Sequence, residues 1–257
     1  MSQKTIKQTE TEDLRRALEE RTLQVEAVTK ELEKFTYSVS HDLRAPLRAI
    51  EGFSRILLED YNDKLDEDGR RYLNIIDCSS RKMTHLLDAL LMFSRLGRQE
   101  LKLTRLNMHE LVSSVWDELN SQTAPRKIEL KLNKIPDALG DVTLMRHIWE
   151  NLLGNAIKFT AKKDRAIIEI SGKLKRGQVV YCIKDNGVGF NMKAADKLFG
   201  VFQRLHSQEE FDGNGMGLAL VRRLVRRHSG DIWGEAEVGE GATFCFHLPS
   251  LVRPEKN

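Results

Sequence analysis

The sequence is poor in cysteine, proline and aromatic residues. Its 257 residues include three cysteines, five prolines and 7% aromatic side chains. Cys78, Cys182 and Cys245 are far apart and lack C-x-x-C spacing, so the sequence indicates neither a zinc-binding cysteine cluster nor the disulfide framework of a small secreted domain. We therefore expect all three to be reduced thiols in a protein core.

Charge of one sign and long hydrophobic runs are also lacking. The 41 Lys and Arg residues nearly balance 38 Asp and Glu residues, for a net charge of +3, so overall charge gives no indication of binding to nucleic acid or to a membrane surface. No run approaches the ~18 apolar residues of a membrane span, and the polar start MSQKTIKQTETEDLRR does not resemble a signal peptide. We expect a cytoplasmic chain with no nucleic-acid partner and no membrane span.

Apolar residues recur in alternating steps of four and three near the start of the chain. Apart from one polar interruption at Arg21, the stripe consists of Leu14, Leu18, Val25, Val28, Leu32, Phe35 and Val39. This spacing is the heptad pattern of a coiled coil. A single amphipathic helix on a globular core is the alternative, but the first 44 residues contain no Pro or Gly and both flanks of the stripe are charged. The pattern favours the coiled coil.

The heptad pattern is irregular around His41. The steps from Phe35 to Val39 and from Val39 to Leu43 are both four residues, and the stripe then continues as Pro46, Ile50, Phe53 and Leu57. A proline inside a helix lacks an N–H and crowds the carbonyl four residues earlier, here that of Asp42. We expect an interrupted coil and a kink at this place.

A second apolar stripe follows a polar, turn-like run at residues 61–69. It consists of Tyr72, Ile76, Ser79, Met83, Leu86, Leu90 and Phe93. Together the two stripes predict an antiparallel helical hairpin. Two helices bury only one narrow seam, whereas two paired hairpins enclose the core of a four-helix bundle. We therefore expect a homodimer.

The composition changes near residue 100 to short alternating segments typical of strands. The strand-like segments are KIELKLN, AIIEISGKLK, QVVYCIKD and ATFCFHL, and helical patterns occur at 107–120, 142–160 and 215–229. One sheet covered by helices is the simplest packing of these elements.

Four short segments of this second region contain side chains suited to nucleotide binding. They are NLLGNAIKF at 151–159, DNGVGF at 185–190, GNGMGL at 213–218 and GEGATF at 239–244. In the first, Asn151, Asn155, Lys158 and Phe159 share one helical face. An amide oxygen can ligate Mg²⁺, an ammonium can meet phosphates and a ring can cover a base. A solvated helix face is the alternative, but the apolar residues between them indicate a buried helix.

The glycine-rich segments have simpler alternative readings. On local sequence DNGVGF fits a hairpin turn, but no alternating return strand follows, which leaves Asp185 at a strand end above two glycines. Glycine lets a flat base approach the backbone, and a carboxylate accepts a hydrogen bond from an amine. GNGMGL precedes an apolar helix, whose free N–H groups favour a phosphate, although a plain glycine-rich helix start would look the same. It matches neither the dinucleotide fingerprint nor a P-loop.

In order and spacing these segments resemble the N, G1, G2 and G3 boxes of the Bergerat-type ATP-binding domain, which histidine kinases, type II topoisomerases, heat-shock chaperone ATPases and mismatch-repair ATPases share. FGVF at 199–202 resembles the F box. SVSHDLRAPLRAI at 38–50 resembles the H box of sensor histidine kinases, and FQRLHS at 202–207 is similar to the phytochrome-like subset. The resemblance covers residues 30–250.

This resemblance implies a role for each matching residue. His41 would be the nucleophile and Asp42 the acidic residue that assists it, although adjacent helical residues do not face each other without a kink and a suitable rotamer. Asn155 would be the Mg²⁺ ligand. The other implied nucleotide contacts are Asn151, Lys158, Phe159, Asp185 as the adenine reader, Gly187, Gly189, Gly213, Gly215, Gly217, Thr243, and Arg204 within a lid at 191–212.

The expected architecture is a helical hairpin that forms a dimeric four-helix bundle, followed by an α/β sandwich. We predict a coiled coil at 1–34, a phosphoacceptor hairpin at 35–98, an ATP-binding domain at 99–250 and a tail at 251–257. The resemblance implies ATP- and Mg²⁺-dependent phosphorylation of His41 and transfer to an aspartate of a separate response regulator, with the sensor module outside this chain. An ATP-binding pseudokinase scaffold is the alternative, and a chaperone-like ATPase is disfavoured by the H box.

Overall fold

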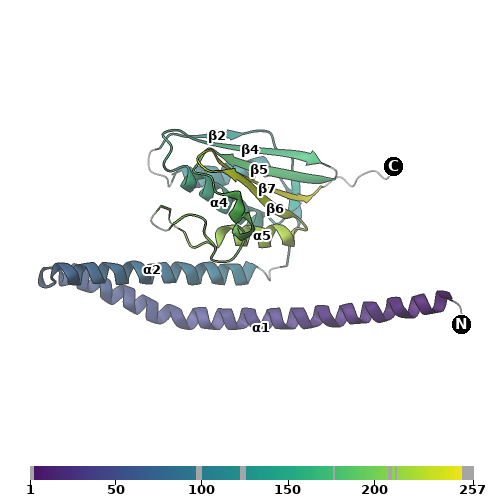
Figure 1. Cartoon of the computed structure of the whole chain (residues 1–257), viewed down its shortest axis with the longest axis horizontal. Helices are drawn as coiled ribbons and strands as arrows, with labels where there is room; N and C mark the ends of the chain where they lie inside the picture. Colours follow the sequence, from purple (N-terminus) through teal and green to yellow (C-terminus); the bar gives the residue numbers. More distant parts are fainter. Residues whose placement is uncertain are drawn as a thin grey trace. The chain divides into compact units, whose positions relative to one another are not determined.

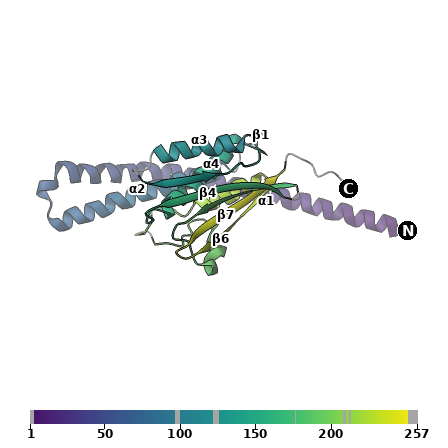
Figure 2. The same ribbon diagram turned by 90° about the horizontal axis from the view of Figure 1, so that it is seen from above.

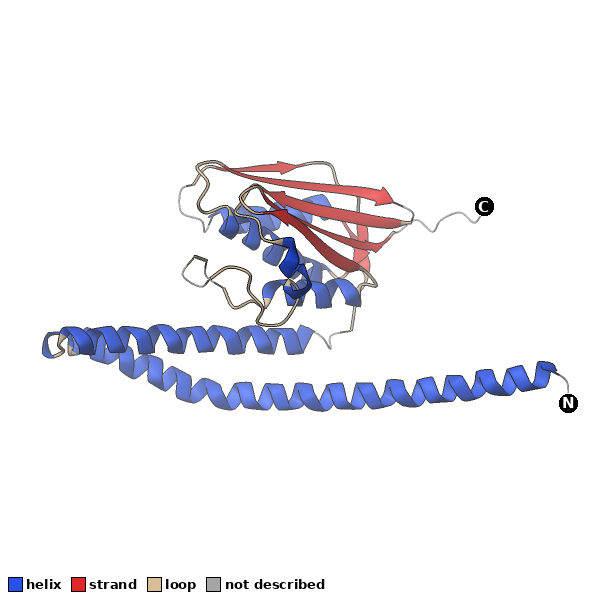
Figure 3. Cartoon of the chain, viewed as in Figure 1, coloured by secondary structure: helices blue, strands red, loops and turns tan. Residues whose placement is uncertain are grey.

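The chain divides into two compact units, Met1–Ser94 and Arg95–Asn257. The computed structural model describes residues 3–96, 100–121, 126–175, 177–207, 210–211 and 213–250 (Figures 1 and 3). In these ranges, no helix combines the length and apolar character that crossing a bilayer requires. The predicted tail at 251–257 lies outside the described residues.

The first unit is a helical hairpin, as the sequence predicted. Helix α1 (Gln3–Asp60) contains Pro46 without ending there, so the proline does not break the helix. Its ribbon is continuous and bends along its length (Figure 1). A short 3-10 helix, η1 (Asn62–Lys64), leads into α2 (Glu67–Leu96).

Helix α2 begins earlier than the turn-like composition of residues 61–69 suggested. The side chain of Asp66 accepts a hydrogen bond from the backbone N–H of Gly69 at 2.7 Å. This contact satisfies one of the free donors at the helix start, as an N-cap residue does. The polar residues that read as turn therefore include the cap and first turn of α2.

The seam between the two helices is lined by small and polar residues as well as leucine. The buried positions are Ser40, Leu47 and Ser54 on α1, seven residues apart, and Asp77, Ser80 and Leu91 on α2. The predicted apolar stripe, by contrast, is exposed at Val39, Leu43, Ile50, Phe53, Leu57, Tyr72, Ile76 and Met83. One copy of the hairpin therefore leaves most of this stripe uncovered.

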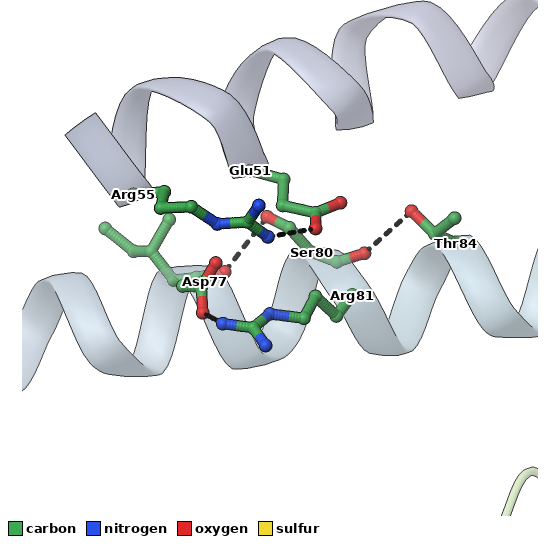
Figure 4. A network of polar contacts seen from close by, with 7 residues as sticks. Glu51, Arg55, Asp77, Ser80, Arg81 and Thr84 are labelled. Atoms are coloured by element: carbon green, nitrogen blue, oxygen red, sulfur yellow. Dashed lines mark hydrogen bonds and ion pairs between the residues drawn. The ribbon is translucent and has the colours of Figure 1, made fainter.

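Charged side chains flank the polar part of the seam. Arg55 donates to Glu51 at 2.8 Å on α1, and Arg81 pairs with Asp77 on α2 (Figure 4). The hydroxyl of Ser80 donates to the carbonyl of Ile76 at 2.9 Å. These polar side chains thus form their hydrogen bonds and ion pairs with groups of their own helix.

The second unit is built on a mixed five-stranded sheet with helices packed on one face (Figure 2). Its strand order is β2 (Ile128–Leu132), β4 (Ala166–Lys175), β5 (Gln178–Asp185), β7 (Gly241–Pro249), β6 (Asp231–Glu237), with β2 parallel to β4 and the other pairs antiparallel. The remaining elements are β1 (Thr104–Leu106) paired with β3 (Ala138–Gly140), α3 (Met108–Ser121), α4 (Val142–Phe159), η2 (Met192–Lys197) and α5 (Gly217–Arg227).

The core of this unit lies between the sheet and α4. The rings of Trp149, Tyr181 and Phe246 are buried and meet with centroids 5.3 to 6.1 Å apart. Along β5, Tyr181 faces the helices, whereas Lys184 is exposed. Because side chains alternate across a strand, the position of each residue on β5 and β7 tells which face it occupies.

Helix α4 is fixed at both ends. Asp141 caps its start, because Oδ1 accepts from the backbone N–H groups of Thr143 and Leu144 at 3.0 and 3.2 Å. At the other end, the guanidinium of Arg126 donates to the carbonyl of Thr160 at 2.8 Å. The helix that carries four predicted site residues is therefore held in place.

The prediction of three reduced core thiols is wrong. Cys182 and Cys245 form a disulfide between β5 and β7, with Cα atoms 4.1 Å apart, and Cys78 is exposed on α2. Strand pairing brings the two residues opposite each other although they are 63 positions apart in the sequence. Spacing rules for cysteine motifs could not detect this pairing.

Candidate functional site

His41 and Asp42 lie together on the surface of α1. Their side chains are 69% and 74% exposed, and Nδ1 of His41 lies 3.2 Å from Oδ1 of Asp42. An ionised carboxylate only accepts hydrogen bonds, so this contact places the ring proton on Nδ1. Nε2 then carries the lone pair of the neutral ring and can act as a nucleophile.

The surroundings of His41 hold its part of the hairpin together. The ring of Tyr37, one turn earlier, stacks on the imidazole with centroids 6.5 Å apart. Arg44 donates to Asp88 of α2 at 2.7 Å. The two helices are thus joined by an ion pair within one turn of the candidate nucleophile.

Asp185 ends strand β5 as a nearly buried carboxylate. Only 5% of the residue is exposed, and Oδ1 accepts from the backbone N–H of Gly187 at 2.8 Å. Burial raises the pKa of this carboxyl, while hydrogen bonds from the N–H groups of Gly187 and Ala242 act in the opposite direction. A buried acceptor of this kind can select a ligand amine.

The loop after Asp185 is packed too tightly for side chains. A Cβ on Gly187 would stand 2.6 Å from the carbonyl oxygen of Phe159 and 2.7 Å from Oδ1 of Asp185. Gly189 has φ +61°, and a Cβ there would meet the carbonyl oxygen of Glu237 at 1.9 Å. The N–H of Val188 donates to the Phe159 carbonyl at 3.2 Å, which joins this loop to the end of α4.

Two of the predicted site residues of α4, Asn151 and Lys158, meet the glycine-rich segment that leads into α5. Nδ2 of Asn151 donates to the His147 carbonyl at 2.8 Å, and its Oδ1 would lie 2.7 Å from a Cβ on Gly217. Nζ of Lys158 lies 3.1 Å from where a Cβ on Gly213 would stand. Two segments 55 to 66 residues apart in the sequence are thereby brought together.

The start of α5 has the form of an anion site. Gly213 and Gly215 have φ values of +138° and +69°, and the helix begins at Gly217. The side chain of Asn214 accepts from the N–H of Met216 at 3.1 Å. The N–H groups of the first helical turn have no partner within the helix and attract phosphate oxygens.

Arg204, the predicted lid arginine, is engaged with the backbone of its own segment. Its guanidinium donates to the carbonyls of Gly213, Phe211 and Ser207 at 2.7, 2.6 and 3.2 Å. A contact with phosphate would require Arg204 to share or exchange these bonds, so its phosphate role stays a prediction.

Two lid residues that sequence reasoning missed pack against the predicted base-packing residue. The rings of His206 and Phe211 have centroids 5.4 and 5.1 Å from that of Phe159. No sequence motif places His206 in a nucleophile or metal-ligand cluster, which favours a structural or surface role for it. The available signal was the presence of ring residues in the lid, which also contains Phe199 and Phe202.

Thr243 is not on the face of the sheet that carries Asp185. Strand register pairs Thr243 with the exposed Lys184, whereas Asp185 pairs with Ala242. Residues directly opposite each other point to the same face, so Thr243 points away from the carboxylate. Ala242, which the sequence analysis did not single out, is the β7 residue beside Asp185.

The residues present suit a magnesium nucleotide. They provide a buried carboxylate acceptor, glycines whose space is too narrow for a Cβ, the Lys158 ammonium and the start of α5. Within the described ranges, no group of three or more His, Cys, Asp or Glu side chains could hold a metal ion. A magnesium ion bound with a nucleotide usually takes its oxygen ligands from phosphates, water and one or two protein side chains, and the amide oxygen of Asn155 would be such a ligand.

Two family models match the chain. Residues 31–99 match the His Kinase A (phospho-acceptor) domain. Residues 140–252 match the histidine kinase-, DNA gyrase B- and HSP90-like ATPase. The first match falls mainly on the helical hairpin and the second on the sheet unit.

Relatives and solved structures agree with these matches. The chain is 32% identical to phytochrome-like protein Cph1 of Synechocystis sp. over 88% of its own length and 30% of that protein. It spans about 30% of the length of Cph1 and of cyanobacterial phytochromes A and B of Nostoc sp.. It is 28% identical to full-length ShkA in complex with AMPPNP (TM-score 0.61, covering 86% of this chain and 47% of that chain).

A further solved structure shares the fold. This is ThkA in complex with response regulator protein TrrA, at 24% identity and a TM-score of 0.59, with 87% of this chain and 63% of that chain covered. Together with the two family matches and the phytochrome-like relatives, these findings identify the chain as the catalytic core of a sensor histidine kinase.

Proposed function

We propose that the chain binds Mg-ATP in the sheet unit, phosphorylates His41, and passes the phosphoryl group to an aspartate of a response regulator. The observation that carries the proposal is the exposed imidazole of His41 with its Nδ1 held by Asp42 at 3.2 Å. A pseudokinase scaffold would need no such pair. The intact pair therefore favours a kinase.

Asp42 controls the proton of the attacking imidazole. It accepts the hydrogen bond from Nδ1–H, which leaves the lone pair on Nε2. The Nε2–phosphorus bond forms as the bond between the γ-phosphorus and the β,γ-bridging oxygen breaks, and ADP leaves. The ring gains positive charge in this step, and the nearby carboxylate of Asp42 stabilises that charge.

The sheet unit orients the nucleotide. Asp185 accepts a hydrogen bond from the exocyclic amine of the base, and Phe159 packs on that base. Lys158 and the free N–H groups at the start of α5 hold phosphate oxygens, while Asn151 and Asn155 contribute amide oxygens, Asn155 as the magnesium ligand. A magnesium ion held there would supply neutralisation of the phosphate charge. The distances among α4, the loop 185–190 and α5 support these roles.

The hairpin functions as a homodimer. Apolar side chains at Leu43, Ile50, Phe53, Ile76 and Met83 are exposed in one copy, and such a contiguous stripe normally marks an interface. A second hairpin would cover it and complete a four-helix bundle. The N-terminal part of α1, which is exposed at Leu18, Val25, Val28 and Phe35, would continue this dimer as a coiled coil towards a sensor module.

The later acceptor is a receiver domain on a separate protein. A phosphoramidate on an exposed histidine is open to attack by a carboxylate of another protein, and ThkA, whose fold this chain shares, was solved with the response regulator TrrA. We place the reaction in the cytoplasm, where ATP is available.

Labelling with γ-labelled ATP and Mg²⁺ tests the proposal. Label on the wild-type chain should be lost in acid and survive base, as for a phosphoramidate. His41→Gln should abolish labelling and retain ATP binding, whereas His109→Gln, at an exposed position of α3, should label normally. Full labelling of His41→Gln would refute the assignment.

A further inference from the structure

His206 touches three parts of the candidate nucleotide site at once. Its Nε2 donates to the carbonyl of Gly189 at 2.9 Å. Its ring lies 5.4 Å from that of Phe159 and 5.5 Å from that of Phe211, measured between centroids. One side chain therefore joins the loop after Asp185, the end of α4 and a later lid residue.

The acceptor of this hydrogen bond lies on a fixed loop. The residue before it, Val188, donates to the Phe159 carbonyl at 3.2 Å and accepts from the N–H of Gly239 at 2.8 Å. Gly189 itself leaves no space for a Cβ against Glu237. The loop is thus held in place without His206. The hydrogen bond from His206 to Gly189 therefore fixes the position of the segment that carries His206.

The segment that carries His206 also has internal structure of its own. Phe202 has φ +61°, a left-handed conformation that bulky residues rarely adopt. This turn lies against Gly215, where a Cβ would stand 2.6 Å from the Gln203 carbonyl oxygen. The guanidinium of Arg204 donates hydrogen bonds to the carbonyls of Ser207 and Phe211. The contacts of His206 join this segment to Gly189 and Phe159.

We propose that His206 is a positioning residue that holds residues 202–207 of the lid against Gly189 and Phe159 before the nucleotide binds. The inference rests on the proposed function, since it gives the lid a role in binding Mg-ATP. Binding costs less free energy when the contacting segment is already ordered. His206 is therefore a determinant of nucleotide affinity, and the rate of phosphoryl transfer at saturation does not depend on it.

Three variants separate the two contacts of the side chain. His206→Ala removes both the donor and the ring, His206→Gln retains a donor, and His206→Phe retains a ring. For His206→Ala we expect Kd for Mg-AMPPNP, measured by calorimetry, to rise about tenfold, because one hydrogen bond and one ring contact are lost. KM for ATP in His41 labelling should rise equally with an unchanged maximal rate. Gln and Phe should each restore part of the affinity.

A nucleotide-free measurement distinguishes positioning from a general loss of structure. Backbone amides of residues 203–207 should exchange hydrogen faster in His206→Ala than in the wild type, while amides of β5 remain unchanged. His109→Ala, on α3, is the matched control and should leave affinity and exchange unaltered.

Several outcomes would overturn the inference. Unchanged affinity in His206→Ala would show that the contact does not position the lid, and tighter binding would make His206 an obstruction. If the wild type binds Mg-AMPPNP but is not labelled, the proposed kinase function fails while the positioning role is still measured by Kd and exchange. If the wild type does not bind the analogue at all, both proposals fail.

Discussion

The amide oxygen of Asn151 lies directly against the backbone of Gly217. A Cβ added to Gly217 would stand 2.7 Å from Oδ1 of Asn151, closer than real side chains approach. The contact joins α4 to the first residue of α5, and Lys158 meets Gly213 beside it. The junction of these two helices therefore admits only glycine unless Asn151 moves.

Gly217→Ala should displace Asn151 and weaken nucleotide binding. Alanine is a better helix former than glycine by about 1 kcal/mol, so the variant should fold. The added methyl group pushes the Asn151 amide from its place and partly closes the start of α5. We expect Kd for Mg-AMPPNP to rise at least about tenfold, which corresponds to the loss of one or two hydrogen bonds. Calorimetry on the folded variant measures this.

Gly154→Ala is the matched control for that substitution. Gly154 lies on α4 between Asn151 and Asn155, and nothing lies within 4 Å of where its Cβ would stand. We expect a gain of about 0.5–1 kcal/mol in the free energy of unfolding and unchanged affinity. Equal losses of binding in both alanine variants would show that the Asn151 contact is not the cause.

Asp185→Asn should abolish nucleotide binding without lowering the stability of the free protein. Burial raises the pKa of Asp185 above the unfolded value of 3.8, so the folded state binds the proton more tightly than the unfolded state. Its charge therefore lowers the free energy of unfolding at neutral pH, and this cost disappears as the pH falls below 3.8. An amide carries no such charge.

Thermal melts at pH 7 with and without Mg-ATP measure both effects. The wild type should gain about 2.7 kcal/mol at 100 times Kd, and Asp185→Asn should show no nucleotide shift. Its melting temperature without nucleotide should equal or exceed that of the wild type. A much lower value would mean that the carboxylate mainly holds the loop together.

The sequence predicted the elements whose periodicity is long or whose residues form a motif. Hairpin helices, α3, α4, α5 and the four strands with clear alternation were expected near their observed positions. Strands β1, β3 and β6 were missed. Two of them are only three residues long, and β6 alternates around Gly234 with few apolar residues, so their pairing depends on neighbouring strands.

Contacts between distant segments were harder to predict than motifs. The pairing of His41 with Asp42 was expected from a resemblance and is present. The face of the sheet that Thr243 occupies depends on how β7 pairs with β5. The GEGATF motif does not specify this pairing. The contacts of His206 could not be predicted, because the lid that carries it has no periodic hydrophobic pattern.

The Cys182–Cys245 disulfide should stabilise the sheet unit. It closes a loop of 63 residues, and the chain-entropy model assigns such a loop on the order of 4 kcal/mol. Cys182→Ser and reduction of the wild type should both lower the melting temperature. Cys78→Ser, at an exposed position of α2, should not.

Thiol titration of the unfolded chain counts the free cysteines directly. Without reductant, one thiol should react, that of Cys78, and three should react after reduction. Three reactive thiols without reductant would contradict the disulfide. Equal melting of Cys182→Ser and the wild type would show that the bond does not contribute to stability.

Acidification below pH 6.5 should destabilise the sheet unit through His228. This buried histidine, at the end of α5, donates from Nδ1 to the Leu224 carbonyl at 2.8 Å and accepts at Nε2 from the N–H of Asp141 at 3.1 Å. Burial is the main cause that lowers its pKa below 6.5; Arg227 acts in the same direction and the Asp141 carboxylate against it. Protonation would set an N–H against the N–H of Asp141.

The sign of the effect follows from proton uptake. The unfolded chain protonates His228 near pH 6.5, whereas the folded chain resists protonation, so stability is fully present above pH 6.5 and is lost as the pH falls towards the folded pKa. One proton gives a slope of at most about 1.4 kcal/mol per pH unit. Melts from pH 7.5 to 5.5 should show this slope in the wild type and in the control His109→Gln. His228→Gln should flatten it, because glutamine has no proton to gain; an equally steep slope in that variant would assign the acid sensitivity to another group.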